Sequence, residues 1–484
     1  MKKRTLKEKT VSGLIWSFVD NFAVKGLQFA VGVILARILS PKEFGLVGIL
    51  AIFIAISQSF IDSGFSQALI RKKDCSQADY STVFYFNFVV GIIMYALLFL
   101  LAKPISLFFN EPILKQLIRV FGLSVIFISL DIIQRTIISK ELNFKLMAQV
   151  SFFAYIISGI AAIVFAHRGW GVWSLVILTL GKYGLTALFM WIRTHWRPSL
   201  EFSIASFKEL FSFGSKLLVS GLINAIFRNV YYVIIGKYFT AIELGYYTRA
   251  DNFKMLPSEN ITQIIQRVSY PVLSSIKDDT VRLKENYRKL IKSTMLITFV
   301  LMFGLAAVAR PMILALIGEK WLPSVIYLQL LCFVGMFYPL HALNLNMLQV
   351  EGRSDLILRL EIIKKCLTVP IIVIGIFYGI KIMIVGMIIN TIIAYYLNSY
   401  WSGKFIGYST VAQIKDFFPL FIVAAIQGGI VFFIGKVLSL SPVVVLSIQL
   451  TVGALITIAL CELVKIDSYS EIKTIIIQKL KGRK

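Results

Sequence analysis

The sequence predicts an all-α protein that crosses a membrane many times and contains two related halves. Its 484 residues are 58% hydrophobic and only 15% charged, and the mean hydropathy is +0.80. Soluble domains are about 45–50% apolar and about 25% charged, so this chain has too little polar surface for a water-soluble protein. The net charge is +25. The basic excess lies mainly in alternate loops, which is typical of a membrane protein and not of a nucleic-acid-binding one.

Apolar runs of roughly 17–25 residues predict about fourteen membrane-spanning helices. The first six are 11–36, 44–70, 82–102, 116–138, 148–166 and 170–192. The next six are 209–236, 244–275, 288–309, 324–349, 359–378 and 380–401. A last pair covers 415–438 and 442–463. Segment 244–275 is the most polar of these predicted spans.

A short motif follows the first predicted span and returns two hundred positions later. It reads RILSPKEFG at Arg37–Gly45 and KYFTAIELG at Lys237–Gly245. In both copies a hydroxyl residue precedes a glutamate by three positions, as in Ser40 with Glu43 and Thr240 with Glu243. This spacing is that of a capping box, in which the two side chains bind free backbone N–H groups at a helix start. The motif predicts a helix start after spans 1 and 7, and a structural role for both glutamates.

The duplication extends beyond this motif and divides the chain into lobes. Lys103-Pro104 after span 3 matches Arg310-Pro311 after span 9. Six spans per copy is an even number, so both copies enter the membrane from the same side and a twofold axis along the membrane normal should relate them. We expect an N-terminal lobe at 1–206, a C-terminal lobe at 207–403, and helices 13 and 14 with a cytoplasmic tail at 404–484.

The distribution of basic residues places both termini in the cytoplasm. The tail from Lys465 to Lys484 is rich in Lys and Arg, with apolar residues on one helical face at Ile472, Ile475, Ile476 and Leu480. This pattern predicts an amphipathic helix lying on anionic lipid. A solvated basic tail is the alternative.

Polar side chains follow single faces of four predicted spans. Lys25 and Gln28 share a face of span 1 with Asn21, and Asn224 and Arg228 share a face of span 7. Spans 2 and 8 carry corresponding sets, namely Ser59, Asp62 and Ser66 in span 2 and Glu259, Thr262, Gln263, Gln266 and Arg267 in span 8. Polar groups in a membrane are costly and usually face a cavity or a partner. The matched faces predict a wet cavity between the lobes, and helix-to-helix hydrogen bonding is the alternative for any single residue.

Three other ionisable residues lie in predicted spans. Asp131 and Arg135 are four positions apart in span 4 and should form an ion pair, which we interpret as structural. His341 in span 10 could titrate near neutral pH, although a hydrogen-bonded packing histidine is the alternative. The four cysteines are scattered without metal-ligand spacing, and no nucleotide-binding or hydrolase motif is present. We therefore expect no metal and no cofactor.

Four stretches resemble a known family: LARILSPKEFGLVGI, IDSGFSQALIRKKD, ELGYYTRADNFKMLP and RVSYPVLSSIKDD. They are similar to the Wzx-type polysaccharide flippases of the multidrug/oligosaccharidyl-lipid/polysaccharide (MOP) exporter superfamily. The resemblance implies a V-shaped, MATE-like fold of two six-helix repeats plus two C-terminal helices, in the bacterial cytoplasmic (inner) membrane. It also implies translocation of an undecaprenyl-diphosphate-linked oligosaccharide, such as an O-antigen, capsule or exopolysaccharide unit, by alternating access.

Under the flippase hypothesis the polar faces become the substrate site. Lys25, Arg228 and Arg267 would hold the anionic diphosphate, and Gln28, Asn224 and Gln263 would serve sugar hydroxyls. Candidates for coupling to H⁺ or Na⁺ are Asp62, Glu259 and His341. The alternative is an ion-coupled drug or organic-cation antiporter of the same superfamily, for which Asp62 and Glu259 would bind the substrate. A membrane-embedded polymerase or glycosyltransferase would need a sizeable extramembrane loop with acids or histidine, and the sequence contains none.

Overall fold

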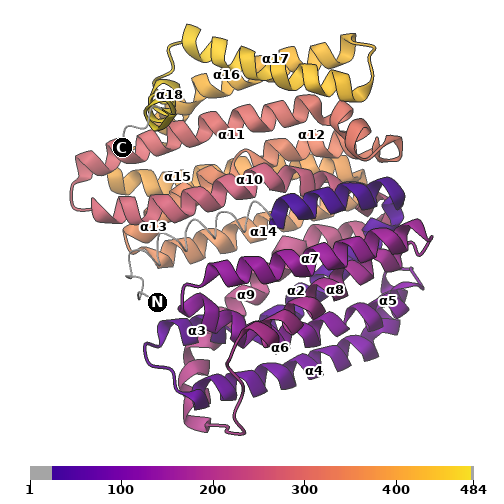
Figure 1. Ribbon diagram of the computed structural model, residues 1–484. Coiled ribbons are helices and arrows are strands. Elements are labelled where there is room, and N and C mark those ends of the chain that lie inside the picture. The colour runs from indigo at the N-terminus through magenta and orange to yellow at the C-terminus, as the bar shows by residue number, and fades with distance from the viewer. Residues whose placement is uncertain (1–23, 481–484) are drawn as a thin grey trace. The chain divides into compact units, whose positions relative to one another are not determined.

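The computed structural model describes residues 24–480, which form α-helices, one short 3-10 helix and their connections, without a strand in that range (Figure 1). The predicted all-α class is confirmed. Residues 24–38 are helical and continue the first predicted span, whose beginning lies outside the described residues. By packing, the chain divides into two compact units, Met1–Gly245 and Tyr246–Lys484.

The first unit contains eight labelled helices. They are α2 (Pro41–Asp62), α3 (Phe65–Arg71), α4 (Gln77–Phe108), α5 (Leu114–Phe121), α6 (Leu123–Lys140), α7 (Phe144–His167), α8 (Val172–Arg193) and α9 (Ile204–Tyr238). Helix α10 (Ala241–Ser275) begins in the first unit and continues in the second. The second unit adds α11 (Thr280–Leu316), η1 (Glu319–Trp321), α12 (Ser324–Gly335), α13 (Tyr338–Val350), α14 (Ser354–Tyr378), α15 (Ile380–Ile406), α16 (Thr410–Val437), α17 (Pro442–Leu463) and α18 (Asp467–Leu480).

Eleven helical segments among the described residues are long and apolar enough to cross a membrane. Three predicted spans are not among them. Span 11–36 lies partly outside the described residues, and spans 244–275 and 359–378 correspond to the long helices α10 and α14, which carry more polar residues. The chain is therefore a multi-pass membrane protein, whereas the number fourteen and the 6+6 repeat remain predictions.

One predicted span is broken at a point where two helices approach closely. Helix α2 ends at Asp62 and α3 begins at Phe65, and the two residues between them, Ser63 and Gly64, have positive φ values of 44° and 74°. A Cβ at Gly64 would lie 2.6 Å from the carbonyl oxygen of Gly214 on α9. Only a glycine combines this left-handed backbone with such a close contact at little cost, so the break lets α9 pack against the end of α2.

Both capping boxes form as predicted. The Ser40 N–H donates to Glu43 Oε2 at 2.5 Å, and Ser40 Oγ lies 3.0 Å from the same oxygen. In the second copy the Thr240 N–H donates to Glu243 Oε2 at 3.2 Å, and the Glu243 N–H donates to Thr240 Oγ1 at 3.1 Å. These bonds satisfy backbone donors at the starts of α2 and α10, which supports the structural interpretation of both glutamates.

The two copies of the motif also contact each other reciprocally within the first unit. A methyl group at Gly45 would overlap the carbonyl of Ala241, and one at Gly245 would overlap the carbonyl of Pro41. Gly45 and Gly245 are equivalent positions of the repeat, as are Pro41 and Ala241. Each glycine thus receives the backbone of the opposite copy's first helical turn, which explains why both copies keep a glycine there.

Helix α9 packs on the N-terminal helices through aromatic side chains. Phe207 and Phe211 of α9 stack with ring centroids 5.3 Å apart, and Phe65 of α3 lies 5.9 Å from Phe207. Phe86 of α4 joins them at 5.2 Å. Because of this packing the compact unit extends to Gly245, beyond the lobe end predicted at 206. The end of a sequence repeat need not coincide with the end of a compact unit, so the lobe assignment remains a prediction.

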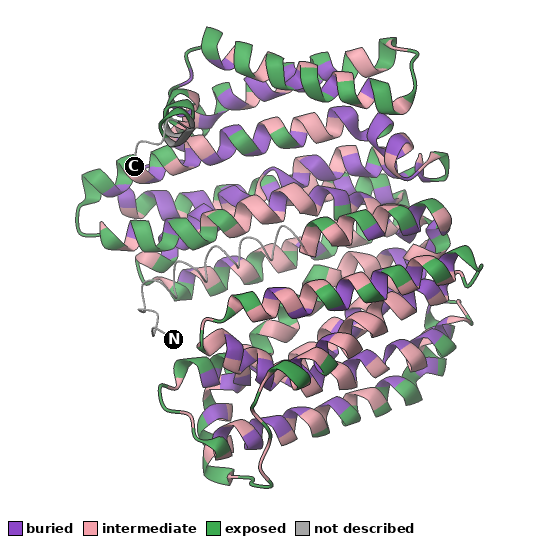
Figure 2. Ribbon diagram, in the orientation of Figure 1, coloured by how far each residue is buried: buried purple, intermediate pink, exposed green. Residues whose placement is uncertain are grey.

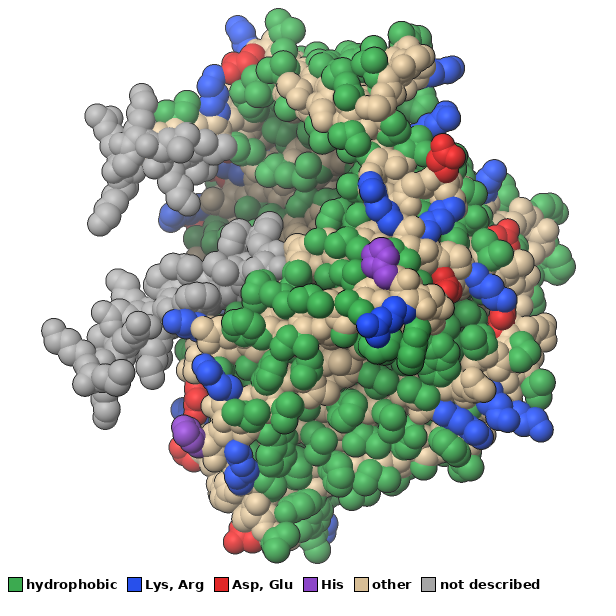
Figure 3. Space-filling view, turned by 45° about the vertical axis from the view of Figure 1, so that its right-hand side comes forward, with side chains coloured by type: hydrophobic (Ala, Val, Ile, Leu, Met, Phe, Trp, Pro, Cys, Tyr) green, Lys and Arg blue, Asp and Glu red, His purple; other side chains and the backbone are tan. Residues whose placement is uncertain are grey.

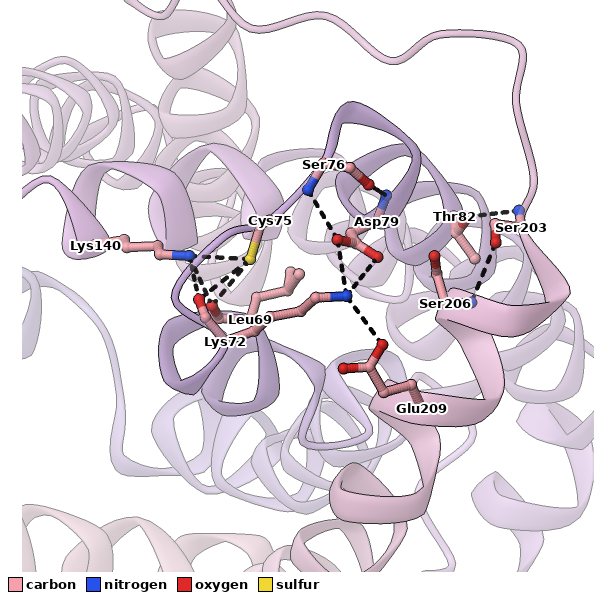
Figure 4. A network of polar contacts seen from close by, with 10 residues as sticks. All are labelled: Leu69, Lys72, Cys75, Ser76, Asp79, Thr82, Lys140, Ser203, Ser206 and Glu209. Atoms are coloured by element: carbon pink, nitrogen blue, oxygen red, sulfur yellow. Dashed lines mark hydrogen bonds and ion pairs between the residues drawn. The ribbon is translucent and has the colours of Figure 1, made fainter.

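A polar network ties the α3–α4 loop to the start of α9 (Figure 4). Lys72 Nζ donates to Asp79 Oδ1 at 3.1 Å and to Glu209 Oε2 at 3.0 Å. Asp79 is buried and also accepts the Ser76 N–H at 2.8 Å, which caps α4. The hydrogen bond to Glu209, followed by the contacts with Asp79, raises the pKa of Lys72 although burial opposes the shift.

The second unit has its core along α11 and α16, which run side by side (Figure 1). Phe299 and Phe303 of α11 meet Phe421 of α16 edge to face, with centroids 5.3 and 5.1 Å apart. Such pairs contribute about 0.5–1.5 kcal/mol each beyond their buried area. Helix α18, predicted from the tail, is confined by ion pairs of Lys292 with Asp467 at 3.1 Å and of Lys473 with Glu462. Whether α18 lies on lipid remains a prediction.

The outer surface is apolar. Exposed residues follow the outer side of helices such as α4 (Figure 2), where Leu100 is 72% exposed. Hydrophobic side chains cover much of the face shown in Figure 3. In the second unit Phe377 is 79% exposed. Large apolar residues exposed over whole helices are what a lipid-facing surface requires.

We predict that Gly45→Ala and Gly245→Ala will each lower thermal stability in detergent by about 1–3 kcal/mol, because the added methyl groups overpack a backbone contact. Gly429→Ala on α16 is the matched control, since a Cβ there meets nothing within 4 Å. The control should be neutral or slightly stabilising. Equal behaviour of all three variants would contradict the reciprocal contact.

We also predict a graded loss from the Lys72 network. Lys72→Met leaves the buried Asp79 carboxylate without its cation and should cost about 1–3 kcal/mol. Glu209→Gln removes a carboxylate whose side chain is 61% exposed and should cost less than about 1 kcal/mol. The raised pKa means that the Lys72 contribution is complete below its unfolded pKa and is lost as pH rises through the folded value. Thermal unfolding at pH 7 and pH 11 measures both effects.

Candidate functional site

A cavity of about 840 Å³ lies inside the first unit. Its walls come from residues 24–28 of the first helix and from α2, α3, α6, α7, α8 and α9. In terms of the predicted repeat, α9 is the first span of the second copy, so both copies contribute to the lining. Apolar residues such as Ile128 and Leu217 alternate with a large set of uncharged polar side chains: Gln28, Gln58, Ser59, Ser66, Gln67, Thr136, Ser139, Ser151, Tyr183, Thr186, Asn224 and Asn229.

Among the residues that the structure describes, five ionisable side chains other than tyrosine line this cavity. Two are acidic, Asp62 and Asp131, and three are basic, Arg135, Lys182 and Arg228. The described part of the lining therefore carries one net positive charge. Amide and hydroxyl groups together with a few charges are typical of a site that binds a polar ligand within a membrane.

The charges on α6 and α8 are close enough to interact. Arg135 Nε donates to Asp131 Oδ2 at 2.6 Å, which confirms the ion pair predicted from their spacing. Asp131 is 4% exposed, whereas the Arg135 side chain is 35% exposed. Lys182 of α8 acts electrostatically on the same carboxylate. The pair predicted to be structural thus belongs to the cavity wall.

Four of the predicted site residues share this cavity: Gln28, Asp62, Asn224 and Arg228. Asp62 Oδ1 accepts the Ser66 N–H at 3.1 Å, so this carboxylate also helps to hold the α2–α3 break. Lys25 lies on the same helix as Gln28 but is not among the lining residues. Asn21, from the same predicted face, lies outside the described residues. The functional roles of these residues remain predictions.

The three predicted substrate and coupling residues of span 8 lie on α10, in the second unit. Glu259 and Gln263 are partly buried, and Arg267 is exposed. These residues belong to the second unit, whereas spans 1 and 7 belong to the first. That the polar faces of spans 1, 7 and 8 line one cavity therefore remains a prediction.

His341 has hydrogen-bond partners at both ring nitrogens. Nε2 lies 2.9 Å from Thr391 Oγ1, and Nδ1 lies 3.3 Å from Asn398 Nδ2. Both partners are on α15, so the ring joins α13 to α15 within the second unit. This arrangement favours the packing alternative over ion coupling.

Sequence reasoning missed Lys182, Gln58 and Tyr183. Gln58 Nε2 donates to Tyr183 Oη at 3.2 Å across the cavity wall between α2 and α8. A lysine in the middle of an apolar span is itself a signal of function, and Lys182 could have been selected on that ground. Within residues 24–480 no cluster of His, Cys, Asp and Glu could hold a metal ion, and all four cysteines are free thiols.

The fold and the cavity define the class of protein: a multi-pass, all-helical membrane protein with a polar cavity. Over 93% of this chain and 98% of the other, it superposes on the lipid II flippase MurJ in an inward closed conformation, with a TM-score of 0.74 and 18% identity. An inward-facing multidrug resistance MATE family transporter of the MOP superfamily matches over 82% of this chain and 98% of its own length, with a TM-score of 0.63 and 17% identity. These similarities show the fold.

The family follows from sequence. A family model described as "Polysaccharide biosynthesis protein" matches residues 34–326. The lipopolysaccharide biosynthesis protein WzxC of Escherichia coli K12 is 30% identical over 407 residues, which is 81% of each chain. The chain therefore belongs to the polysaccharide biosynthesis protein family, as a Wzx-type member of the MOP superfamily.

We predict that His341→Gln will lower the amount of folded protein, because one of two interhelical hydrogen bonds is lost at a cost of about 1 kcal/mol. The pH dependence of transport per folded molecule should not change. A flattened pH profile at normal abundance would instead identify His341 as a coupling residue.

Proposed function

We propose that the protein is a flippase that moves an undecaprenyl-diphosphate-linked oligosaccharide from the cytoplasmic to the periplasmic leaflet of the bacterial inner membrane. The observation that carries this proposal is the large polar cavity inside a unit whose helices are apolar outside. Membership of the polysaccharide biosynthesis family, and a fold shared with a lipid II flippase, support the same class of substrate.

The cavity chemistry suits a sugar chain. Its side-chain amides include Gln28, Gln58 and Asn224, and amides both donate and accept hydrogen bonds as sugar hydroxyls do. The volume of about 840 Å³ lies near the upper end of ordinary ligand pockets, roughly 300–1,000 Å³. A few sugar residues would fit at one time, so a longer unit would extend beyond this cavity.

The anionic headgroup requires cations. Arg228 lines the cavity from α9, and Lys25 lies one helical turn from Gln28. We propose that these two cations, with Arg267 from α10, attract the diphosphate by charge-assisted hydrogen bonds. In this proposal the substrate moves by alternating access of two lobes, 1–206 and 207–403. Helices 13 and 14 and the tail form a separate segment at 404–484. Both termini are cytoplasmic, and Asp62 or Glu259 couples transport to H⁺ or Na⁺.

The second candidate is an antiporter of drugs or organic cations, as the name of the MATE neighbour suggests. The observation in its favour is the pair of carboxylates in the cavity, Asp62 and Asp131. Asp131 is already neutralised by Arg135 at 2.6 Å. Because bases exceed acids in the lining, an organic cation would meet net repulsion there.

The test is surface delivery of polysaccharide in cells lacking their own copy of this gene. Arg228→Gln should reduce delivery about ten- to a hundredfold, since a neutral amide replaces a charge-assisted contact. Arg228→Lys and Lys25→Arg should retain more activity than Arg228→Gln and Lys25→Gln, because a phosphate accepts either cation. Membrane abundance is measured for every variant.

The matched control is Arg193→Gln at the exposed end of α8, away from the cavity lining. It should deliver polysaccharide normally. Full delivery by all the Lys25 and Arg228 variants, with loss only in Asp62→Asn, would overturn the flippase proposal in favour of the cation antiporter.

A further inference from the structure

Two cations of the cavity wall have no part in the diphosphate site proposed above. Arg135 projects from α6 and Lys182 from α8, and both line the same cavity. The Lys182 Nζ atom lies 5.0 Å from the centroid of the Tyr183 ring. This ammonium group makes no hydrogen bond or ion pair with any described residue. A lysine placed in a polar membrane cavity without such a partner is available to an anion.

Arg135 is held in one orientation by its own helix. Its Nε donates to Asp131 at 2.6 Å, one turn earlier on α6, and Asp131 is almost fully buried. The terminal guanidinium nitrogens make no hydrogen bond to the residues that the structure describes. These nitrogens form the end of the planar fork, which binds two oxygens of a carboxylate side by side.

The charge of this cluster selects among anions. Arg135 and Lys182 contribute two positive charges and Asp131 one negative charge, which leaves one net positive charge. A carboxylate carries one negative charge and matches this sum. A diphosphate carries more, and Asp131 would repel its additional charge at close range. The cluster is therefore better matched to a carboxylate than to the headgroup of the lipid.

The surroundings of the cluster are those of a sugar site. Gln58 and Tyr183 are hydrogen-bonded to each other beside Lys182, and Thr136 and Ser139 continue the lining along α6. Amides, hydroxyls and one aromatic ring next to a carboxylate-binding fork would recognise a sugar that bears an acid group.

From these observations we infer that Arg135 and Lys182 form a subsite for the carboxylate of an acidic sugar in the transported glycan. Asp131 sets the charge of the subsite and orients Arg135. This inference rests on the proposed function, since it specifies the substrate class that the same cavity accepts. It assigns the sugar acid to residues of α6 and α8, whereas the diphosphate is assigned to Lys25 of the first helix and Arg228 of α9.

The binding test uses full-length protein in detergent and follows thermal stabilisation by glucuronate, glucose and inorganic pyrophosphate at equal ionic strength. Glucuronate should stabilise the wild type more than glucose does. Arg135→Gln and Lys182→Gln should weaken the glucuronate response about tenfold or more, and Lys182→Arg should restore most of it. Lys103→Gln, which removes an exposed cation of α4 outside the cavity, is the control and should respond as wild type.

Asp131→Asn separates a charge-setting role from a merely structural one. Loss of the carboxylate raises the charge of the cluster, so the response to pyrophosphate should increase relative to the response to glucuronate. A purely structural aspartate would lower stability without changing this ratio. An unchanged ratio would overturn the role assigned to Asp131.

A cellular arm distinguishes this inference from the proposed function. Cells making a glycan with a uronic acid and cells making its neutral counterpart are compared for surface delivery. Wild type should deliver the acidic glycan better, and Lys182→Gln should remove that preference. Equal delivery of both glycans by wild type and variant, or stabilisation by pyrophosphate alone through Arg135 and Lys182, would overturn the acidic-sugar subsite and leave the flippase intact. Failure of wild type to deliver either glycan would overturn the proposed function itself.

Discussion

The cost of an unpaired polar group in hydrocarbon is the constraint on which the rest of this structure depends. In a membrane each unsatisfied backbone or side-chain group costs several kcal/mol, so helices form wherever the chain crosses. Side chains bind the free backbone N–H groups at the helix starts, as Glu43 does for the Ser40 N–H before α2. Many hydroxyl residues within spans donate back to their own helix, as Thr186 does to the Lys182 carbonyl at 2.6 Å. Other polar side chains bond between helices, as His341 does with Thr391, and a further set of amides and hydroxyls lines the cavity of the first unit.

The same constraint explains the duplicated motif. A helix that re-enters the membrane needs its first N–H groups satisfied, and the capping box does so in both copies. A hydroxyl residue and a glutamate are enough for this purpose. The glycine that follows has a different cause, because Gly45 and Gly245 each accept the backbone of the opposite copy. Capping and close approach are independent requirements, and their combination makes the motif recognisable at two places in one chain.

The sequence predicted those features that depend on residues close together along the chain. Apolar length predicted the helices, the serine-to-glutamate spacing predicted the caps, and the interval of four positions predicted the Asp131–Arg135 ion pair. The position of that pair was not predictable in the same way, because it depends on the rotation of α6 against α8. Lys182 was missed for this reason, although a lysine within an apolar run was a usable signal. The break at Ser63 and the extension of the first unit through α9 likewise depend on contacts between residues far apart in sequence.

Transport also limits how strongly a cavity can bind. A site that holds its ligand too firmly on one side of the membrane does not release it on the other, so binding must be favourable yet reversible. A cavity lined by bases alone would bind an anionic substrate tightly, and each uncompensated cation would destabilise the empty state. Asp131 pairs with Arg135, and under the proposed function this carboxylate would moderate both effects, because it compensates a cation and would reduce the net attraction for an anion. The carboxylates of the lining are therefore compatible with an anionic substrate. In the proposed flippase they would stabilise a cationic cavity within the membrane and would permit release of the anionic substrate.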